Sequence, residues 1–192
     1  MNETQDRLLD TAADLFAGLG YAGVSMRDIA RAVGITQAAI YHHFPNKDAL
    51  YIAAAGFLFE KLTLGINNQL ATSNDPRERL RLLVGSMLKT MDEDPRFRRL
   101  YLRELMEGDE SRLAALARNT FPTFYETPYE LMRELAPNQD PQLLIFSLSG
   151  LVIHHLEARK LGPHLPHSPP YVRDLPALTA HITQLIMSGI EP

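Results

Sequence analysis

The sequence contains no cysteine, so it can form neither a disulfide framework nor a thiolate metal site. That absence fits the reducing interior of a cell. No apolar run reaches the roughly 18 residues that a membrane-spanning helix needs. The N-terminal segment MNETQDRLLD is acidic and polar, unlike a signal peptide. The sequence therefore predicts a cytoplasmic protein that does not enter a membrane.

An excess of basic residues is also absent. The chain has 19 Lys and Arg residues against 23 Asp and Glu residues, a net charge of −4, which argues against a protein that coats nucleic acid nonspecifically. Between Val24 and Lys47 the balance reverses, because Arg27, Arg31 and Lys47 face only one acid, Asp28. This small basic patch suits a short footprint, or a dimer that doubles it.

Motifs for catalysis and metal binding are missing as well. The sequence has no Gly-rich phosphate loop, no nucleophile-elbow pattern, and no Ser, His and acid set that spacing would bring together. Two of the C-terminal histidines, His154 and His155, are adjacent and so point to different helix faces, while His164 and His167 lie in a Pro-rich loop. We expect no catalytic residue, no metal site and no cofactor.

Helical periodicity dominates what is present, and no β-like alternation of useful length or internal repeat interrupts it. Asp-Pro pairs at 75–76, 94–95 and 140–141 each predict a helix start, since Asp suits the N-cap and Pro the first helical position. Pro128 is expected to kink or restart its helix. Outside the segment discussed next, we predict helices near 4–19, 47–64, 76–92, 95–107, 111–119, 121–136, 141–161 and 171–188.

The stretch from Ser25 to Phe44 predicts two short helices joined by a tight turn. Ser25 and Asp28 form a capping-box-like start, Gly34 can close the first helix in the left-handed conformation, and Thr36 can cap the next. A helix, a turn of about three residues and a second helix make a helix-turn-helix, whose second helix lies in the major groove.

The exposed side of that second helix would carry side chains suited to DNA. Gln37 can pair with adenine through two hydrogen bonds, and small alanines allow close approach to thymine methyl groups. The tyrosine hydroxyl, the imidazoles and Lys47 suit phosphates. From spacing alone, an ordinary amphipathic helical hairpin with a solvated polar face explains the pattern equally well.

From about Gln5 to Leu50 the chain resembles the DNA-binding domain of the TetR family of bacterial one-component repressors, especially in DIARAVGITQAAIYHHFPNKDAL. The resemblance implies base contacts from Arg27, Gln37, Ala38 and Ala39, phosphate contacts from Tyr41, His43 and Lys47, and positions nearby for Thr36 and His42. Met26 departs from the family, since some members carry a small hydroxyl residue there, and Ser25 is expected to supply that phosphate contact instead.

The resemblance also implies an all-α architecture: an N-terminal helix-turn-helix domain at 1–50, followed by a helical effector-binding and dimerisation domain at 51–192. The helices near 141–161 and 171–188 resemble the pair that forms a four-helix bundle between two family subunits. The segment RFRRLYLRE, whose apolar spacing is helical, is expected to present a solvated face and not a second nucleic-acid patch.

The effector-binding residues are less visible in the sequence, because aromatic and Met side chains are also ordinary core material. The mixed aromatic, Met and Leu content fits an apolar or aromatic effector. Candidate pocket residues are Met87, Tyr101, Phe124, Tyr125 and His155.

Two functional hypotheses follow. The first is a homodimeric transcriptional regulator, most simply a repressor, that binds near-palindromic double-stranded operator DNA and is released by a small-molecule effector. The second is a helical small-molecule-binding protein or enzyme whose first 50 residues are an interaction module. The acidic balance of the chain is its only support.

Overall fold

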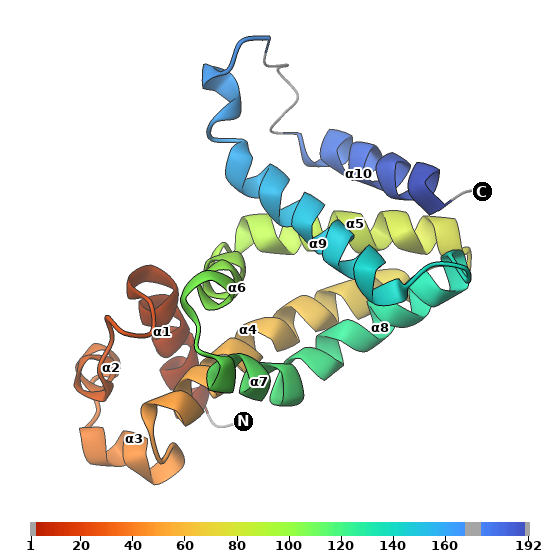
Figure 1. The fold of residues 1–192 in the computed structure, drawn as a ribbon. Coiled ribbons are helices and arrows are strands. Elements are labelled where there is room, and N and C mark those ends of the chain that lie inside the picture. The colour runs from red at the N-terminus through yellow and green to blue at the C-terminus, as the bar shows by residue number, and fades with distance from the viewer. Residues whose placement is uncertain (1–2, 168–173, 191–192) are drawn as a thin grey trace. The chain divides into compact units, whose positions relative to one another are not determined.

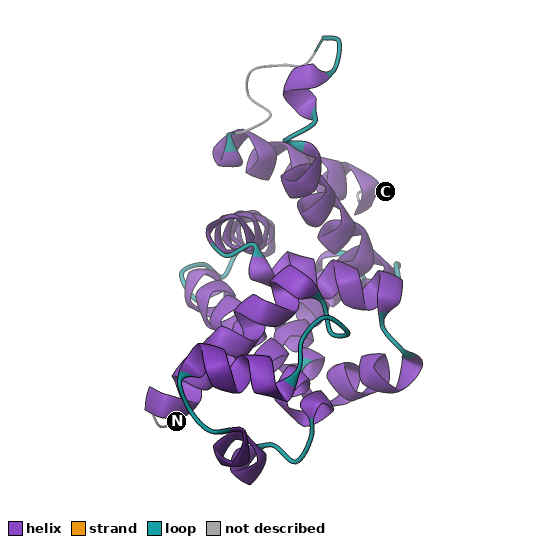
Figure 2. Cartoon of the chain, turned by 90° about the vertical axis from the view of Figure 1, so that its left-hand side faces the viewer, coloured by secondary structure: helices purple, strands orange, loops and turns teal. Residues whose placement is uncertain are grey.

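The computed structural model describes residues 3–167 and 174–190. Over these residues the chain is helical, with loops but no strand between the helices (Figures 1 and 2). The helices in chain order are α1 (Glu3–Leu19), α2 (Met26–Val33), α3 (Gln37–His43), α4 (Lys47–Leu70), α5 (Pro76–Glu93), α6 (Arg96–Glu107), α7 (Glu110–Asn119), α8 (Phe121–Leu135), α9 (Pro141–Ala158), the 3₁₀ turn η1 (Gly162–His164) and α10 (Leu175–Ile190). The predicted all-α class is confirmed.

The Asp-Pro pairs at 75–76 and 140–141 mark helix starts as predicted, whereas α6 begins at Arg96, one residue after its Asp-Pro pair. At α9 the Asp140 carboxylate accepts hydrogen bonds from the backbone of Gln142, at 2.8 Å, and of Leu143, at 3.2 Å. Asp75 accepts from the first turn of α5 in the same way. At α6 the Asp94 carboxylate accepts from the backbone N–H of Arg96 at 3.1 Å.

Several predicted elements differ from the structure, and α9 ends at Ala158 and not near 161. The fourth helix continues past 64 to Leu70, because Ile66 and Leu70 are buried and outweigh the weak helix formers around them. Helix α8 continues through Pro128, which is buried within it, so the predicted restart is wrong and the alternative, a kink, stays a prediction. The residues expected to open the last helix, 171–173, lie outside the described residues, and the described part of that helix begins at Leu175.

Helix α4 is also long and apolar enough, by length and composition, to cross a membrane. Half of its most apolar 18-residue stretch is buried inside the protein, however, which is usual for the core helix of a globular domain.

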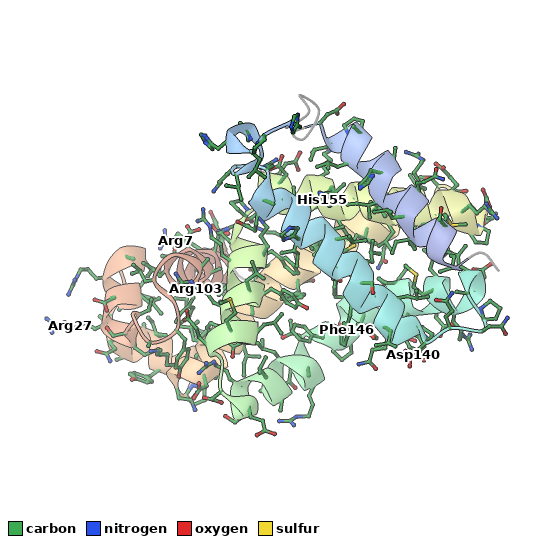
Figure 3. The ribbon with its side chains drawn as sticks, turned by 45° about the horizontal axis from the view of Figure 1, so that its top comes forward. Arg7, Arg27, Arg103, Asp140, Phe146 and His155 are labelled. Carbon is green, nitrogen blue, oxygen red and sulfur yellow. The ribbon has the colours of Figure 1, made fainter. Side chains whose placement is uncertain are left out.

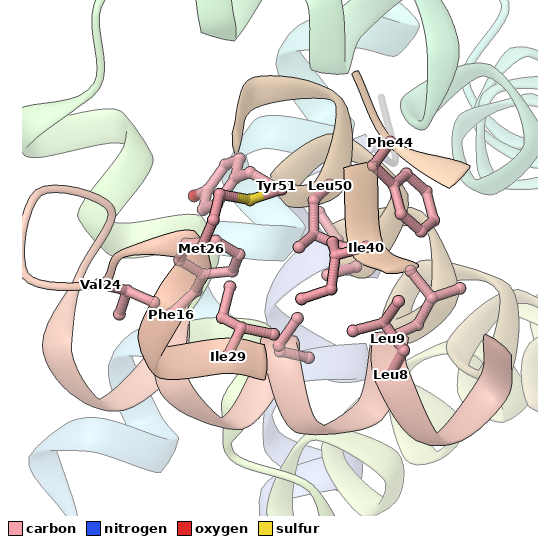
Figure 4. Close-up of a cluster of buried hydrophobic side chains, with 14 of the residues drawn as sticks. Leu8, Leu9, Phe16, Val24, Met26, Ile29, Ile40, Phe44, Leu50 and Tyr51 are labelled. Atoms are coloured by element: carbon pink, nitrogen blue, oxygen red, sulfur yellow. The ribbon is translucent and has the colours of Figure 1, made fainter. Parts of the chain in front are cut away.

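The chain divides into two compact units, and the first comprises the residues up to Lys61 together with Asp94–Phe124. Its core, shown in Figure 4, joins Phe16 of α1, Ile29 of α2, Ile40 of α3 and Leu50 of α4, none of which is exposed to solvent. The same cluster includes Leu100 of α6 and Leu116 of α7. The helix-turn-helix is therefore packed in one core with two helices that come much later in the sequence.

The arginine-rich face of α6 is only partly solvated: Arg99 is exposed, as predicted from RFRRLYLRE, whereas other arginines of this segment contact the protein. Arg96 donates hydrogen bonds to Asp10 at 3.1 Å and Asp14 at 2.8 Å, both on α1, and Arg103 donates to the Gly18 carbonyl at 3.3 Å. Arg98 is only 4% exposed. The prediction was wrong for Arg96 and Arg98, because helical spacing does not show which groups on another helix an arginine will meet.

The second compact unit comprises Leu62–Glu93 and the chain from Tyr125 onward. Within it, α5 packs against both α9 and α10, and these two helices also pack against each other, as Figure 1 shows. Helix α9 buries Leu148 and Val152 within this unit, whereas Leu143 is 64% and Phe146 53% exposed (Figure 3). The helix therefore has apolar side chains that the described residues leave exposed.

Candidate DNA interface

Helix α2 is fixed at both ends by the residues that the sequence indicated. The backbone N–H of Asp28 donates to the Ser25 hydroxyl at 3.2 Å, and the backbone N–H of Ser25 donates to the Asp28 carboxylate at 3.1 Å. This reciprocal pair is a capping box. Hydrogen bonding from Ser25 holds the pKa of Asp28 below its usual 3.8. At the other end Gly34 adopts a φ of 79°, the left-handed conformation that glycine accepts without strain.

Helix α3 begins at a cap of its own and is anchored by few side chains. The Thr36 hydroxyl accepts a hydrogen bond from the backbone of Ala39 at 3.1 Å. Ile40 is fully buried and Phe44 is 8% exposed, so they tie the helix to the core. The rest of α3 is exposed. A short helix with one anchored face can present its other face to a groove.

The predicted DNA contacts fall on one continuous stretch of the chain, and Lys47 is the only one that is not exposed. Arg27 lies on α2, where its side chain is labelled in Figure 3, and Tyr41 on α3 is 46% exposed. The other exposed predicted contacts are Ser25, Thr36, Gln37, Ala38, Ala39, His42 and His43. The hydroxyls of Ser25 and Thr36 already serve as caps, so a phosphate contact by either must share the hydroxyl with the cap.

Lys47 is half-buried because its ammonium group lies 4.0 Å from the centroid of the Tyr21 ring. Asn46 caps α4 next to it, accepting from the backbone of Ala49 at 2.8 Å. Burial lowers the pKa of Lys47; the neighbouring Asp48 opposes this effect and Arg112 adds to it. Lys47 is thus restrained by the protein before any DNA is present.

Sequence reasoning missed a buried polar cluster beside this lysine. Arg112 on α7 pairs with Glu104 on α6 at 2.8 Å, with both side chains less than a tenth exposed. The Tyr51 hydroxyl donates to the same carboxylate at 2.8 Å. Burial first, and then this hydrogen bond, raises the pKa of Tyr51. A cavity of about 250 Å³ adjoins the cluster, lined by Tyr21, Tyr51, Arg103, Glu104 and Arg112 among others.

The candidate effector residues belong to both compact units. Within the first unit, Tyr101 and Phe124 both lie against Phe97, with ring centroids 6.3 and 6.0 Å away. These rings extend an aromatic cluster around Phe59. A small apolar cavity of about 20 Å³ in this unit is lined by Tyr101 and Phe59, among others.

Within the second unit, Met87 is 2% exposed and is part of the core. Tyr125 lies beside Tyr129, and its hydroxyl oxygen is buried without a hydrogen-bond partner. His155 packs edge-on against His181 at 5.6 Å, and burial, reinforced by His181 and His154, lowers its pKa. In the described part of the chain, no three His, Asp or Glu residues form a group that could hold a metal ion.

The chain is similar to known transcriptional regulators. A family model described as "Bacterial regulatory proteins, tetR family" matches residues 8–54. The transcriptional activator FasR of Mycolicibacterium smegmatis is 31% identical over 99 residues, which cover 52% of this chain and 45% of that protein. The transcriptional repressor KstR of the same species is 27% identical over 109 residues, covering 57% and 53%. The chain spans about half the length of these curated relatives.

The whole fold also has solved counterparts. The transcriptional regulator FadR of Bacillus subtilis, crystallised with stearoyl-CoA, superimposes with a TM-score of 0.77 and 17% sequence identity, covering 96% of this chain and 98% of that one. At this identity the likeness establishes the fold alone. The family model, however, matches the segment in which the capped helix-turn-helix lies. Residues 8–54 therefore form a DNA-binding domain of the kind found in bacterial regulatory proteins of the TetR family.

Proposed function

We propose that the protein is a cytoplasmic, homodimeric transcriptional regulator, with no enzymatic activity, that binds operator DNA through α2 and α3. The observation that carries this proposal is the exposed face of α3. It offers Gln37, two alanines, Tyr41 and two histidines, with no acid before Lys47, on a helix that is capped at its start and anchored by Ile40. Such a face satisfies both the shape and the hydrogen-bonding requirements of a major groove.

The contacts divide into two kinds. Arg27, Gln37, Ala38 and Ala39 read base edges, and the hydroxyl of Tyr41 contacts a phosphate. The remaining phosphate contacts come from His43, Lys47 and Ser25, with Thr36 and His42 close to the backbone. This division is the one that the resemblance to the TetR family implies. Side-chain chemistry supports it, because amide and guanidinium groups can match base edges whereas single donors and ammonium groups suit phosphates.

The experiment that tests this proposal is selection of bound duplexes from a random-sequence pool by the full-length protein. We expect a near-palindrome whose half-sites are about 10 base pairs apart, the distance that sets two recognition helices about 34–36 Å apart. Selection of a single unpaired site would contradict the dimeric arrangement. Failure to enrich any sequence would contradict DNA reading itself and favour the interaction-module hypothesis.

The dimer is proposed to form through the helices near 141–161 and 171–188, which correspond to α9 and α10. Leu143 and Phe146 on α9 are more than half exposed, and Leu185 on α10 is 46% exposed. Large apolar side chains gathered on two helices that pack together are typical of a subunit interface.

The effector is proposed to be an apolar or aromatic molecule, bound by residues among Met87, Tyr101, Phe124, Tyr125 and His155. The aromatic cluster around Phe59 supports this class. The structural counterpart FadR was crystallised with stearoyl-CoA, so long-chain acyl thioesters are the first compounds to test. The sign of regulation is proposed to be repression, with effector binding favouring the state of lower DNA affinity.

A titration of the protein–operator complex with acyl-CoA thioesters of increasing chain length, followed by fluorescence anisotropy, tests the effector class. We expect release of DNA that becomes more efficient as the chain lengthens, because each buried methylene adds about 0.8 kcal/mol. Release by free CoA as effectively as by its long-chain thioesters would contradict an apolar effector.

A further inference from the structure

Tyr21, which no sequence motif singled out, lies where the start of α4 meets α7. The Lys47 ammonium is 4.0 Å from the centroid of its ring, and the Arg112 guanidinium carbon is 4.1 Å from the same centroid. The Tyr21 hydroxyl donates a hydrogen bond to Asp48 at 2.6 Å. One aromatic ring therefore contacts two cations, one on α4 and one on α7.

Arg112 is held firmly on its own side of the ring. Its Nε atom donates to Glu104 at 2.8 Å in a pair that is almost fully buried, and its Nη1 atom donates to Asp109 at 3.3 Å. The second oxygen of Glu104 accepts from Tyr51, whose ring meets Tyr21 edge-on at 5.4 Å. Moving the guanidinium would leave a buried carboxylate unpaired, which is strongly unfavourable. Arg112 is thus a fixed support for the Tyr21 ring.

Lys47 gains order from this contact. An exposed lysine samples many rotamers and loses that freedom when it grips a phosphate. Here the ring face attracts the ammonium group through a cation–π interaction and keeps the side chain at the first position of α4. Much of the conformational entropy that Lys47 would lose on binding a phosphate is therefore already lost in the free protein.

We propose that Tyr21 is a positioning residue for DNA binding, whose ring holds Lys47 ready for a phosphate while Arg112 fixes the ring from α7. This inference rests on the proposed DNA-binding function. It also means that a side chain of α7, more than sixty residues beyond the helix-turn-helix, supports a DNA contact through two direct contacts.

The first test compares Tyr21→Leu, Tyr21→Phe and Lys47→Ala in the full chain, with affinity for the selected duplex measured over a salt series. Lys47→Ala should reduce the log–log salt slope by about 1.8, because a complex of two chains loses two phosphate contacts worth about 0.9 each. Tyr21→Leu should weaken binding by roughly threefold to tenfold and reduce the slope in part. Tyr21→Phe retains the ring and should restore most of the affinity.

The double variant Tyr21→Leu/Lys47→Ala separates positioning from a general structural role. If Tyr21 acts through Lys47, the double variant should bind no worse than Lys47→Ala alone. If the two losses instead multiply, or if Tyr21→Phe is as weak as Tyr21→Leu, the proposal is overturned.

A second readout needs no DNA. In an NMR spectrum of the full chain, the Lys47 side-chain methylene protons should be shifted upfield by the Tyr21 ring. The shift should be lost in Tyr21→Leu and reduced in Glu104→Gln/Arg112→Met, which removes the buried pair without leaving a lone charge. Arg118→Met, which removes an exposed cation from the same helix, is the matched control and should leave the shift unchanged.

The two readouts distinguish failure of this inference from failure of the proposed function. If the wild-type protein enriches no duplex, the DNA-binding proposal fails while the NMR result still decides whether the ring holds Lys47. Unshifted Lys47 protons in the wild type, or a shift that survives Tyr21→Leu, would overturn the positioning role.

Discussion

At the scale of single residues, the exposed face of α3 combines side chains that distinguish bases with side chains that do not. Gln37 is the clearest base reader, because its amide can donate and accept hydrogen bonds at one adenine. It is exposed in the first turn of α3, the part of a recognition helix that contacts base edges.

We therefore expect Gln37→Ala to lose about 1–3 kcal/mol of binding free energy on the selected duplex and to relax the preference at one base position. The measurement is affinity for the selected duplex and for duplexes substituted at each position in turn. Equal losses on every duplex would show that Gln37 does not read a base.

His155 makes stability depend on pH. Burial first, then the nearby His181 and His154, lowers its pKa from the usual 6.5. The folded state therefore favours neutral His155, a contribution that is complete above pH 6.5 and is lost as the pH falls through the lowered pKa. Thermal melts between pH 7.5 and 5 should show stability decreasing with acidification, and His155→Gln should flatten that decrease. An unchanged profile in the variant would contradict the assignment.

The residues that the sequence revealed are those with local causes. Ser25, Gly34 and Thr36 act within three or four positions of themselves, so their roles as caps could be predicted and are confirmed. Tyr21 and Arg112 could not be found in this way, since they are 91 positions apart and meet only because α7 belongs to the same compact unit as α1. Arg96 and Arg98 of α6 were misjudged for the same reason.

At the scale of elements, the turn between α2 and α3 sets the direction of the recognition helix. Gly34 has a φ of 79°, and a Cβ added there would meet nothing within 4 Å. A side chain at this position would therefore meet no steric clash, and only the left-handed backbone conformation disfavours it. The left-handed conformation costs an L-residue roughly 1–2 kcal/mol.

We expect Gly34→Ala to lower the free energy of unfolding by about 1 kcal/mol and to weaken DNA binding, because relieving the strain would reorient α3. Gly18→Ala is the matched control, since Gly18 lies in helix α1 with equally open space around it and without a positive φ. Its substitution should be neutral or stabilising. Urea denaturation of both variants measures the difference, and equal stabilities would contradict the strain argument.

Element ends were predicted well where capping residues mark them and poorly where burial decides. The starts of α5 and α9 follow their Asp-Pro pairs. The end of α4 was placed six residues early, because the burial of Ile66 and Leu70 extends the helix to Leu70. Burial is a tertiary property, so a local pattern cannot show it.

At the scale of the whole molecule, the proposed dimer rests on apolar side chains that the described residues leave exposed. Phe146 is 53% exposed in the middle of the apolar helix α9. A carboxylate in the centre of an apolar interface would be desolvated without a partner, which is strongly unfavourable.

Phe146→Asp should therefore convert the dimer to a folded monomer, measured by light scattering after size exclusion, with an unchanged helical signal in circular dichroism. Leu64→Asp is the matched control: Leu64 is 56% exposed and lies on α4, outside the proposed interface. It should remain dimeric. A dimeric Phe146→Asp protein would place the interface elsewhere.

The function class could be predicted from sequence because the helix-turn-helix is local, whereas the effector could not. The residues of an effector pocket come from helices that are distant in sequence. Met, Phe and Tyr side chains are as common in a hydrophobic core as in a pocket, so their presence does not mark one. The candidates Tyr101 and Phe124 do meet at Phe97, but Met87 is core within the other compact unit.

The most direct test of the central claim, that α2 and α3 form a sequence-specific DNA reader, is fluorescence anisotropy of the purified chain with duplexes covering the DNA that flanks its gene. Measurements over a salt series, with a scrambled duplex as control, separate base reading from charge. We predict a tight complex of two chains per site that the scrambled duplex does not form. The account would be contradicted by equal affinity for both duplexes, provided that this result persists after refolding has removed any bound effector and that random-site selection enriches no sequence.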